Sequence, residues 1–287
     1  MALTATEIVP GVDGQRTRVV LVHGSRLSHT QWAPQIRSLT TEFEVVTPDL
    51  PGHGSRAGEA FTLDRAIGAV AEAVEGDTAR DADAPVPPVV LVGHSLGGYV
   101  AMAYAGCFPR RLAGLVLVGS AAVPTGVGAA AYRMVGALTE RAGPERMTRV
   151  NDRVLRRLYP GEVVDEAIAG GYYFDPTPAA WRDVMAYCRP AMLRRVTCPV
   201  VVAGGRWDQL SIQATRFARA APDGRVVRIR GAGHLVGFDQ PGRLAELITE
   251  VARAATSAKG DLSRSESGPA SSSGHDRSFW TSEIDHS

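Results

Sequence analysis

Short apolar segments that alternate with helical patterns restrict the possible folds of this chain more than any other feature. Six runs rich in Val, Leu and Ile, most of them bounded by Gly, Pro or Asp, cover residues 18–22, 44–47, 88–92, 115–118, 200–203 and 226–229. Most of these runs lack alternating polar residues, which is typical of strands buried on both faces of a parallel sheet. The helical patterns between the runs cover residues 32–40, 63–74, 96–108, 213–220 and 243–254. We therefore predict an α/β fold in which a mostly parallel sheet is covered by helices on both faces.

The alternation stops after the fourth strand, and this break predicts the domain organisation. Residues 121–197 contain helix-like stretches rich in Arg, Met, Tyr and Trp, but no convincing strand. We predict that residues 1–120 and 198–256 form the core and that residues 121–197 form a helical cap over the carboxyl edge of the sheet, where ligands bind. The alternative is a set of surface helices without a role in binding.

The last segment of the chain has a different composition. Residues 257–287 are rich in Ser, Gly, Asp and Arg, a composition that buries too little apolar surface to offset the entropy lost on ordering. We predict a disordered tail. Its Phe279, Trp280 and Ile284 form either a docking motif or part of a passive tail.

Charge and rare residues exclude several function classes. In 287 residues, 31 basic and 30 acidic side chains give a net charge of +1, so we expect neither a nucleic-acid nor a membrane partner. The single lysine, Lys259, lies in the predicted tail, which excludes a Walker-type phosphate loop, a pyridoxal Schiff base and a kinase. Cys107, Cys188 and Cys198 form no Cys-x-x-Cys pair and leave one cysteine over from any disulfide. With no signal-peptide pattern and no run of about 20 apolar residues, we predict a cytoplasmic protein.

The strongest chemical signal lies between the third strand and the following helix. Residues 89–104 read Val-Val-Leu-Val-Gly-His-Ser-Leu-Gly-Gly-Tyr-Val-Ala-Met-Ala-Tyr, so a buried strand leads through Gly-x-Ser-x-Gly directly into an apolar helix. A serine on such a tight turn has a strained backbone, and side chains at the two flanking glycines would collide with neighbouring elements. The turn exposes the hydroxyl beside a helix N-terminus, where negative charge is stabilised. The pattern predicts that Ser95 is a nucleophile.

With this turn, the sequence resembles the α/β-hydrolase superfamily over about residues 19–254, nearly all of the predicted ordered chain. The resemblance implies an oxyanion loop after the first buried strand, and Val-His-Gly-Ser-Arg at residues 22–26 occupies that place. In this family the residue after His-Gly and the residue after the nucleophile donate backbone N–H groups to the oxyanion. For this chain the resemblance therefore implies Ser25 and Leu96 as the oxyanion hole.

The same resemblance implies an acid after a late strand and a histidine after the last strand. Asp208 follows the strand ending in Val-Ala-Gly-Gly, and His234 follows Arg-Gly-Ala-Gly, which gives the family order Ser95, Asp208, His234. The rival acids are Asp49, after an early strand, and Asp239, after the histidine.

The chain has six other histidines. His29 is a candidate for substrate contact, and His94 is expected to point away from the nucleophile. Two more match structural loop positions, His23 and His53, and two lie in the tail, His275 and His286.

We predict no metal site and no cofactor. The chain contains no His-x-x-x-His, no His-x-His and no cysteine cluster with ligand spacing. Serine machinery of this kind needs no cofactor. Dehalogenases and epoxide hydrolases of the resembled fold use aspartate as the nucleophile, so Ser95 argues against both activities.

Residues of the predicted cap and the oxyanion loop are candidates for substrate binding. The Tyr, Phe, Trp and Met side chains of the cap either line a pocket for a mainly apolar substrate or pack the cap onto the core; they are Tyr132, Met134, Met147, Tyr159, Tyr172, Tyr173, Phe174, Trp181, Met185, Tyr187 and Met192. Of these, Trp181 and Tyr173 are our binding candidates. Arg26 either meets a substrate carboxylate or hydroxyl, or forms a salt bridge with a neighbouring loop.

Three classes of function fit these residues. The leading prediction is a serine hydrolase that cleaves esters, lactones or thioesters of a small molecule through an acyl-enzyme. The same fold also supports acyl transfer, carbon–carbon bond hydrolysis or cofactor-free oxygenation, in which His234 acts as the base and Ser95 is accessory. The third class is a ligand receptor that has kept the hydrolase fold.

Overall fold

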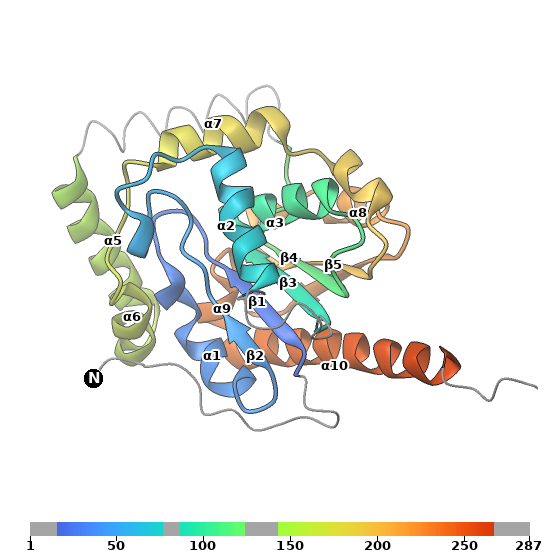
Figure 1. Cartoon of the computed structure of the whole chain (residues 1–287). Helices are drawn as coiled ribbons and strands as arrows, with labels where there is room; N and C mark the ends of the chain where they lie inside the picture. The colour runs from blue at the N-terminus through green and yellow to red at the C-terminus, as the bar shows by residue number, and fades with distance from the viewer. Residues whose placement is uncertain (1–15, 77–86, 124–142, 267–287) are drawn as a thin grey trace, which may run out of the picture.

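The computed structural model describes residues 16–76, 87–123 and 143–266. Its centre is a six-stranded sheet in which all neighbouring strands are parallel, in the order β2-β1-β3-β4-β5-β6 (Figure 1). The strands are β1 (Arg18–Val22), β2 (Glu44–Val46), β3 (Val89–His94), β4 (Gly114–Val118), β5 (Val200–Gly205) and β6 (Gly224–Ile229). Each strand predicted from the sequence is present, so the predicted α/β class with a parallel sheet is confirmed.

The sheet is buried on both faces, as its continuous apolar runs require. In β1, Val19 and Leu21 pack in one apolar cluster while Val20 and Val22 pack in the other, on the opposite face of the sheet. All residues of β3, β4 and β5 are buried, whereas the edge strands β2 and β6 are partly exposed. The four inner strands therefore carry the two layers of the core.

Helices cover each face of the sheet (Figure 1). On one face lie α1 (Ala33–Leu39), α9 (Val236–Asp239) and α10 (Pro241–Glu266); on the other lie α2 (Leu63–Glu75), α3 (Leu96–Cys107) and α8 (Ala214–Ala218). Helix α2 begins after Thr62, whose side chain accepts a hydrogen bond from the backbone N–H of Arg65, and it ends at Gly76, which has a φ of 64°.

Helix α10 is longer than its apolar pattern predicts. We expected a helix over residues 243–254 and a tail from residue 257, but the helix continues to Glu266. Extending an existing helix adds one backbone hydrogen bond per residue without a new nucleation cost, so residues with modest propensity can prolong it. Phe279, Trp280 and Ile284 lie outside the described residues.

The described part of the insertion between β4 and β5, residues 121–123 and 143–197, is helical over most of residues 144–195. It contains α5 (Pro144–Leu158), α6 (Gly161–Ile168), α7 (Thr177–Tyr187) and the 3-10 helix η4 (Pro190–Arg195). Leu155 and Val164 of the insertion pack with Leu27 and with Phe238 of α9. Tyr132 and Met134 lie outside the described residues. The insertion is therefore joined by apolar contacts to the loops that follow the ends of β1 and β6.

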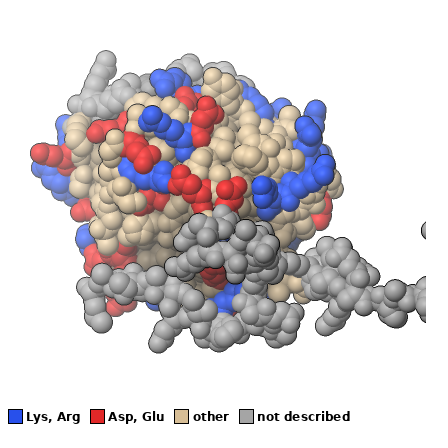
Figure 2. All heavy atoms as spheres, viewed as in Figure 1, with Lys and Arg blue, Asp and Glu red and all other residues tan. Residues whose placement is uncertain are grey.

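Basic and acidic side chains are interspersed on the visible surface (Figure 2), as a chain with a net charge of +1 would suggest. Figure 2 shows Arg side chains and Asp or Glu side chains close to one another over much of the visible face. Within the part of the chain that the structure describes, no helix is both long enough and apolar enough to cross a bilayer.

Candidate active site

The turn between β3 and α3 holds Ser95 in the strained conformation that its sequence context predicts. Ser95 has a φ of 53° and a ψ of −118°, and its backbone N–H donates to the carbonyl oxygen of Val118 on β4 at 2.8 Å. A Cβ atom on Gly93 would lie 2.3 Å from the carbonyl oxygen of Gly97, and a Cβ atom on Gly97 would lie 2.3 Å from that of Val22 on β1. Only glycines therefore allow this close approach of strand and helix.

The structure brings Ser95, His234 and Asp208 into one line of hydrogen bonds. The distance between Ser95 Oγ and His234 Nε2 is 3.1 Å, and the distance between His234 Nδ1 and Asp208 Oδ1 is 2.9 Å. Ser95 comes from the β3–α3 turn, Asp208 follows β5, and His234 follows β6. Because parallel strands point the same way, these three loops meet at the carboxyl edge of the sheet.

The carboxylate of Asp208 is buried and fully hydrogen-bonded. Burial works to raise its pKa, but the hydrogen bond to His234, with further bonds from Ser211 and Leu210, outweighs burial and leaves the pKa lowered. Ser211 Oγ donates to Oδ2 at 2.7 Å, and the backbone N–H of Leu210 donates to Oδ1 at 2.9 Å. An ionised Asp208 can hold the His234 imidazole in the tautomer that carries its proton on Nδ1.

The two residues expected to donate to an oxyanion lie beside this line. Leu96 is the first residue of α3, where backbone N–H groups have no partner within the helix. Ser25 follows β1, and its Oγ lies 3.4 Å from Thr177 Oγ1 at the start of α7. The loop after β1, which carries Ser25, therefore contacts the insertion beside the cavity that Ser95 lines.

A cavity of about 410 Å³ lies above Ser95, within the usual size range of small-molecule sites. Its lining is mainly apolar or neutral polar and consists of Gly24, Ser25, Arg26, Leu27, Gln31, His94, Ser95, Trp181, Gln209, His234 and Leu235. Of our three binding candidates, Arg26 and Trp181 line this cavity. Tyr173 does not; its backbone N–H donates to the carbonyl oxygen of Arg26 at 2.9 Å, and its hydroxyl donates to the carbonyl oxygen of Gly170.

Two buried residues that the sequence did not mark as functional connect the loops of the site. Gln31 Oε1 accepts a hydrogen bond from the backbone N–H of Gly24 at 2.9 Å, and its Nε2 donates to His94 Nδ1 at 3.1 Å. His94 Nε2 then donates to the carbonyl oxygen of His234 at 2.9 Å. Burial, followed by the neighbouring His234, lowers the pKa of His94 to about 4, so its imidazole is neutral. His94 also lines the cavity above Ser95, but its two ring nitrogens bind Gln31 and the carbonyl oxygen of His234.

The rival acids have other partners. Asp239 Oδ2 accepts a hydrogen bond from the backbone N–H of Gly233 at 2.8 Å, which fixes the loop that carries His234. Asp49 binds His29 and Ser55: its carboxylate lies 2.9 Å from His29 Nδ1 and accepts from both the N–H and the hydroxyl of Ser55. Neither carboxylate is hydrogen-bonded to His234 within the described residues.

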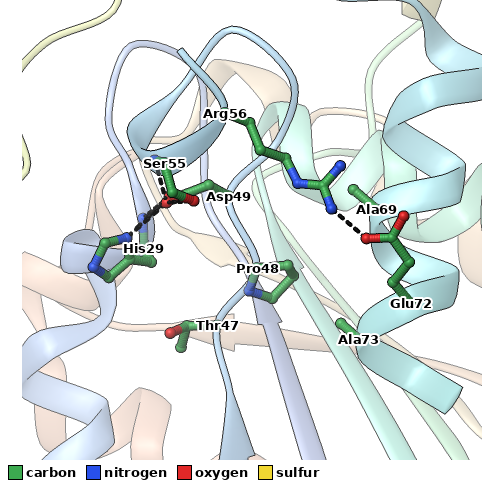
Figure 3. A pocket seen from close by; sticks show the side chains of 9 residues that line it. All are labelled: His29, Thr47, Pro48, Asp49, Ser55, Arg56, Ala69, Glu72 and Ala73. Carbon is green, nitrogen blue, oxygen red and sulfur yellow. Dashed lines mark hydrogen bonds and ion pairs between the residues drawn. The ribbon is translucent and has the colours of Figure 1, made fainter. Parts of the chain in front are cut away.

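His29 and Asp49 line a separate hollow of about 450 Å³ between the loop after β2 and helix α2 (Figure 3). Its charged side chains are paired, His29 with Asp49 and Arg56 with Glu72. Ser95 does not line this hollow, and His29, our candidate for substrate contact, lies outside the cavity above Ser95. Among the described residues, no group of three or more His, Cys, Asp or Glu is arranged to hold a metal ion.

The sheet order, the strained serine turn and the serine–histidine–aspartate line define the α/β-hydrolase fold. The chain belongs to the Alpha/beta hydrolase family, whose model matches residues 19–247. A pimeloyl-[acyl-carrier protein] methyl ester esterase from Aromatoleum aromaticum is 29% identical over 266 residues, covering 83% of this chain and 99% of the relative. A thermophilic esterase from Thermogutta terrifontis has a similar structure, with a TM-score of 0.65 and 29% identity over 84% of this chain and 90% of that chain.

Another solved structure supports the fold assignment. The enol-lactonase from Burkholderia xenovorans superposes with a TM-score of 0.64 over 84% of this chain and 93% of its own. At 20% identity this similarity shows the shared fold and nothing about the substrate.

Proposed function

We propose that this protein hydrolyses a carboxylic ester, lactone or thioester of a mainly apolar small molecule, with Ser95 as the nucleophile. The observation that carries the proposal is the line of hydrogen bonds from Ser95 through His234 to Asp208 beneath a cavity of about 410 Å³. The names of the two esterase relatives agree with this class of reaction.

The reaction begins with His234 as the general base. Its Nε2 accepts the Ser95 proton while Oγ attacks the substrate carbonyl carbon, and the carbonyl electron pair moves onto oxygen. The backbone N–H groups of Ser25 and Leu96 bind this oxyanion, and each such donor contributes on the order of 3 kcal/mol to lowering the barrier. Asp208 stabilises the imidazolium formed on His234.

The tetrahedral intermediate then collapses to an acyl-enzyme. The carbonyl re-forms as the bond to the leaving oxygen or sulfur breaks, and the leaving group takes the proton from His234. In the second half-reaction His234 removes a proton from water as the water oxygen attacks the acyl carbon. His234 then gives this proton to Ser95 Oγ as the bond between Oγ and the acyl carbon breaks, which releases the acid and restores the Ser95 hydroxyl. Protons and electron pairs balance over the cycle without a cofactor.

We further propose that residues 121–197 act as a cap that selects the substrate, while residues 1–120 and 198–256 supply the catalytic core. Trp181 of α7 supports this proposal because it lines the cavity together with Ser95. The contact between Ser25 and Thr177 at the start of α7 also connects the insertion to the oxyanion loop.

The test is labelling with a fluorophosphonate, which forms a covalent bond with an activated serine, combined with turnover of activated esters, lactones and thioesters. We expect the wild-type protein to be labelled and active, and Ser95→Ala to be folded, unlabelled and inactive above background. Ser28→Ala is a matched control for labelling because Ser28 is also a buried serine, but its Oγ lies 3.0 Å from Thr30 Oγ1 and it does not line the cavity. Undiminished turnover by Ser95→Ala would instead favour a reaction in which the serine is accessory.

A further inference from the structure

Within the described residues, one side chain with a permanent charge lines the cavity above Ser95. Among the described residues that line the cavity, Arg26 is the only Arg, Lys, Asp or Glu. The side chain of Asp208 is fully buried behind His234 and does not line the cavity. In the described lining, a substrate therefore meets the Arg26 side chain among mainly apolar and neutral polar residues.

The backbone holds Arg26 in this place at a conformational cost. Arg26 and Ser95 are the only non-glycine residues with positive φ in the described part of the chain, at 71° and 53°, and both line the same cavity. Such conformations are unfavourable for residues other than glycine and persist only where the surrounding structure imposes them. For Arg26 this surrounding structure is a bridge to Tyr173, whose N–H donates to the Arg26 carbonyl oxygen, and the burial of the next residue, Leu27.

The guanidinium of Arg26 is oriented by an aromatic ring from the insertion. Its Cζ lies 5.7 Å from the centre of the Phe174 ring. A guanidinium is attracted to the face of an aromatic ring, and its planar set of N–H groups matches the two oxygens of a carboxylate. The same loop thus carries Ser25, the proposed oxyanion donor, and a group suited to bind a second, anionic part of the substrate.

We propose that Arg26 binds a carboxylate of the substrate, and that the preferred substrates are esters, lactones or thioesters that carry a second, ionised carboxyl group. Half-esters of dicarboxylic acids are the simplest members of this class. This inference rests on the proposed hydrolysis at Ser95, and it places the carboxylate on the side of the oxyanion loop. The spacer between carboxylate and ester contacts apolar lining residues such as Leu27 and Trp181.

The test compares two matched series of methyl esters with increasing chain length, from succinate to suberate. One series ends in a free carboxylate, and the other ends in a neutral carboxamide of the same shape. At the best length we expect kcat/KM of wild type to favour the carboxylate by about tenfold to a hundredfold, the range of a charge-assisted hydrogen bond. Arg26→Gln lowers this preference at least about tenfold, and Arg26→Lys gives an intermediate value because an ammonium cannot form the paired contact.

Arg206→Gln is the matched control. Arg206 is also stacked on an aromatic ring, with its Cζ 5.4 Å from the centre of the Trp207 ring, but it does not line the cavity. We expect Arg206→Gln to show the wild-type preference. A preference that is absent from wild type at every length, or that survives in Arg26→Gln, overturns the inference.

Two further measurements separate this inference from the proposed hydrolysis. Fluorophosphonate labelling reports on Ser95, and calorimetric titration with free dicarboxylates reports on Arg26 without turnover. If Ser95 is labelled but no carboxylate preference is found, hydrolysis stands and the inference is wrong. If no ester is cleaved and no label is incorporated, but dicarboxylates bind at least about tenfold more weakly to Arg26→Gln than to wild type, the Arg26 site stands and hydrolysis is wrong.

Discussion

At the scale of single residues, the main role of Asp208 is to orient the His234 imidazole. Its carboxylate accepts hydrogen bonds from His234, Leu210 and Ser211. In Asp208→Asn the side-chain amide can donate to Nδ1, which favours the tautomer that carries its proton on Nε2 and cannot accept the Ser95 proton. We expect kcat to fall at least about 10³-fold while the fold is kept, as measured by ester turnover and circular dichroism.

Asp239→Asn is the matched control for this prediction. Asp239 follows His234 in the same loop region, but its carboxylate accepts from the backbone N–H of Gly233. We expect a much smaller loss of activity in this variant, because it weakens a loop contact and leaves the His234–Asp208 hydrogen bond in place. A nearly silent Asp208→Asn together with a crippling Asp239→Asn would contradict the assignment of the acid.

At the scale of elements, Gln31 connects three loops that come from distant parts of the chain. Through Gly24 it fixes the oxyanion loop, and through His94 it reaches the carbonyl oxygen of His234. In Gln31→Ala the N–H of Gly24 loses its partner and the proposed oxyanion loop is less well ordered. Because that loop binds most strongly in the transition state, we expect kcat to fall about tenfold to a hundredfold with little change in KM.

Gln35→Ala separates this positioning role from a general loss of packing. Gln35 is also buried, one helical turn further along, but its Nε2 donates to the carbonyl oxygen of Gly237 and it does not line the cavity. We expect Gln35→Ala to lower the melting temperature without the selective fall in kcat. Equal kinetic effects in the two variants would show that Gln31 acts only through stability.

Helix α7 carries the second prediction at this scale. Trp181 lines the cavity and packs edge-on against Tyr99, with ring centres 6.0 Å apart, whereas Tyr187 on the same helix is 63% exposed. Trp181→Ala enlarges the cavity, so we expect kcat/KM to shift towards longer acyl groups by about tenfold, measured over a series of esters. Tyr187→Ala should keep the wild-type profile. An unchanged profile in Trp181→Ala would mean that α7 is a packing element.

The elements and loops also differ in how far the sequence predicts them. All six strands were predicted from their apolar runs, which are most continuous in the inner strands because these are buried on both faces. Ser95 was predicted from its strand–turn–helix context, whereas Asp208 and His234 were implied by the resemblance to the α/β-hydrolase superfamily. Gln31 carries no comparable signal, since its partners Gly24 and His94 are brought to it only by the tertiary fold. Tyr173 is a similar case. Its aromatic side chain suggested contact with substrate, but in the structure its backbone N–H binds the carbonyl oxygen of Arg26, and no sequence pattern indicates this contact.

For the molecule as a whole, buried neutral histidines predict sensitivity to acid. Burial, together with nearby histidines, lowers the pKa of His23 to about 3 and that of His94 to about 4, from 6.5 in the unfolded chain. His23 Nε2 must stay unprotonated because it accepts the N–H of Leu50 at 3.0 Å. Between pH 6.5 and about 4 the unfolded chain therefore binds protons that the folded chain does not. For each of these histidines the free energy of unfolding falls by about 1.4 kcal/mol per pH unit in this window.

Two variants test this prediction in opposite directions, by urea unfolding at a series of pH values from 7 to about 4.5. His94→Gln removes one of the two histidines with a lowered pKa. The slope of unfolding free energy against pH should therefore decrease by about 1.4 kcal/mol per pH unit, the contribution of one proton.

The hydrogen bond to Asp49 raises the pKa of His29, so this histidine contributes stability that is present at low pH and is lost as the pH rises above 6.5. His29→Gln should therefore steepen the fall only at the upper end of the range, near and above pH 6.5, and leave the slope at lower pH as in wild type. The lowered pKa values of Asp49 and Asp208 act below about pH 4, outside this window, because their unfolded value is 3.8. If His94→Gln kept the wild-type slope, His94 would not be neutral in the folded protein. The hydrogen bond between Gln31 and His94 would then need the opposite assignment, with His94 Nδ1 as the donor, while His94 Nε2 would still donate to the carbonyl oxygen of His234.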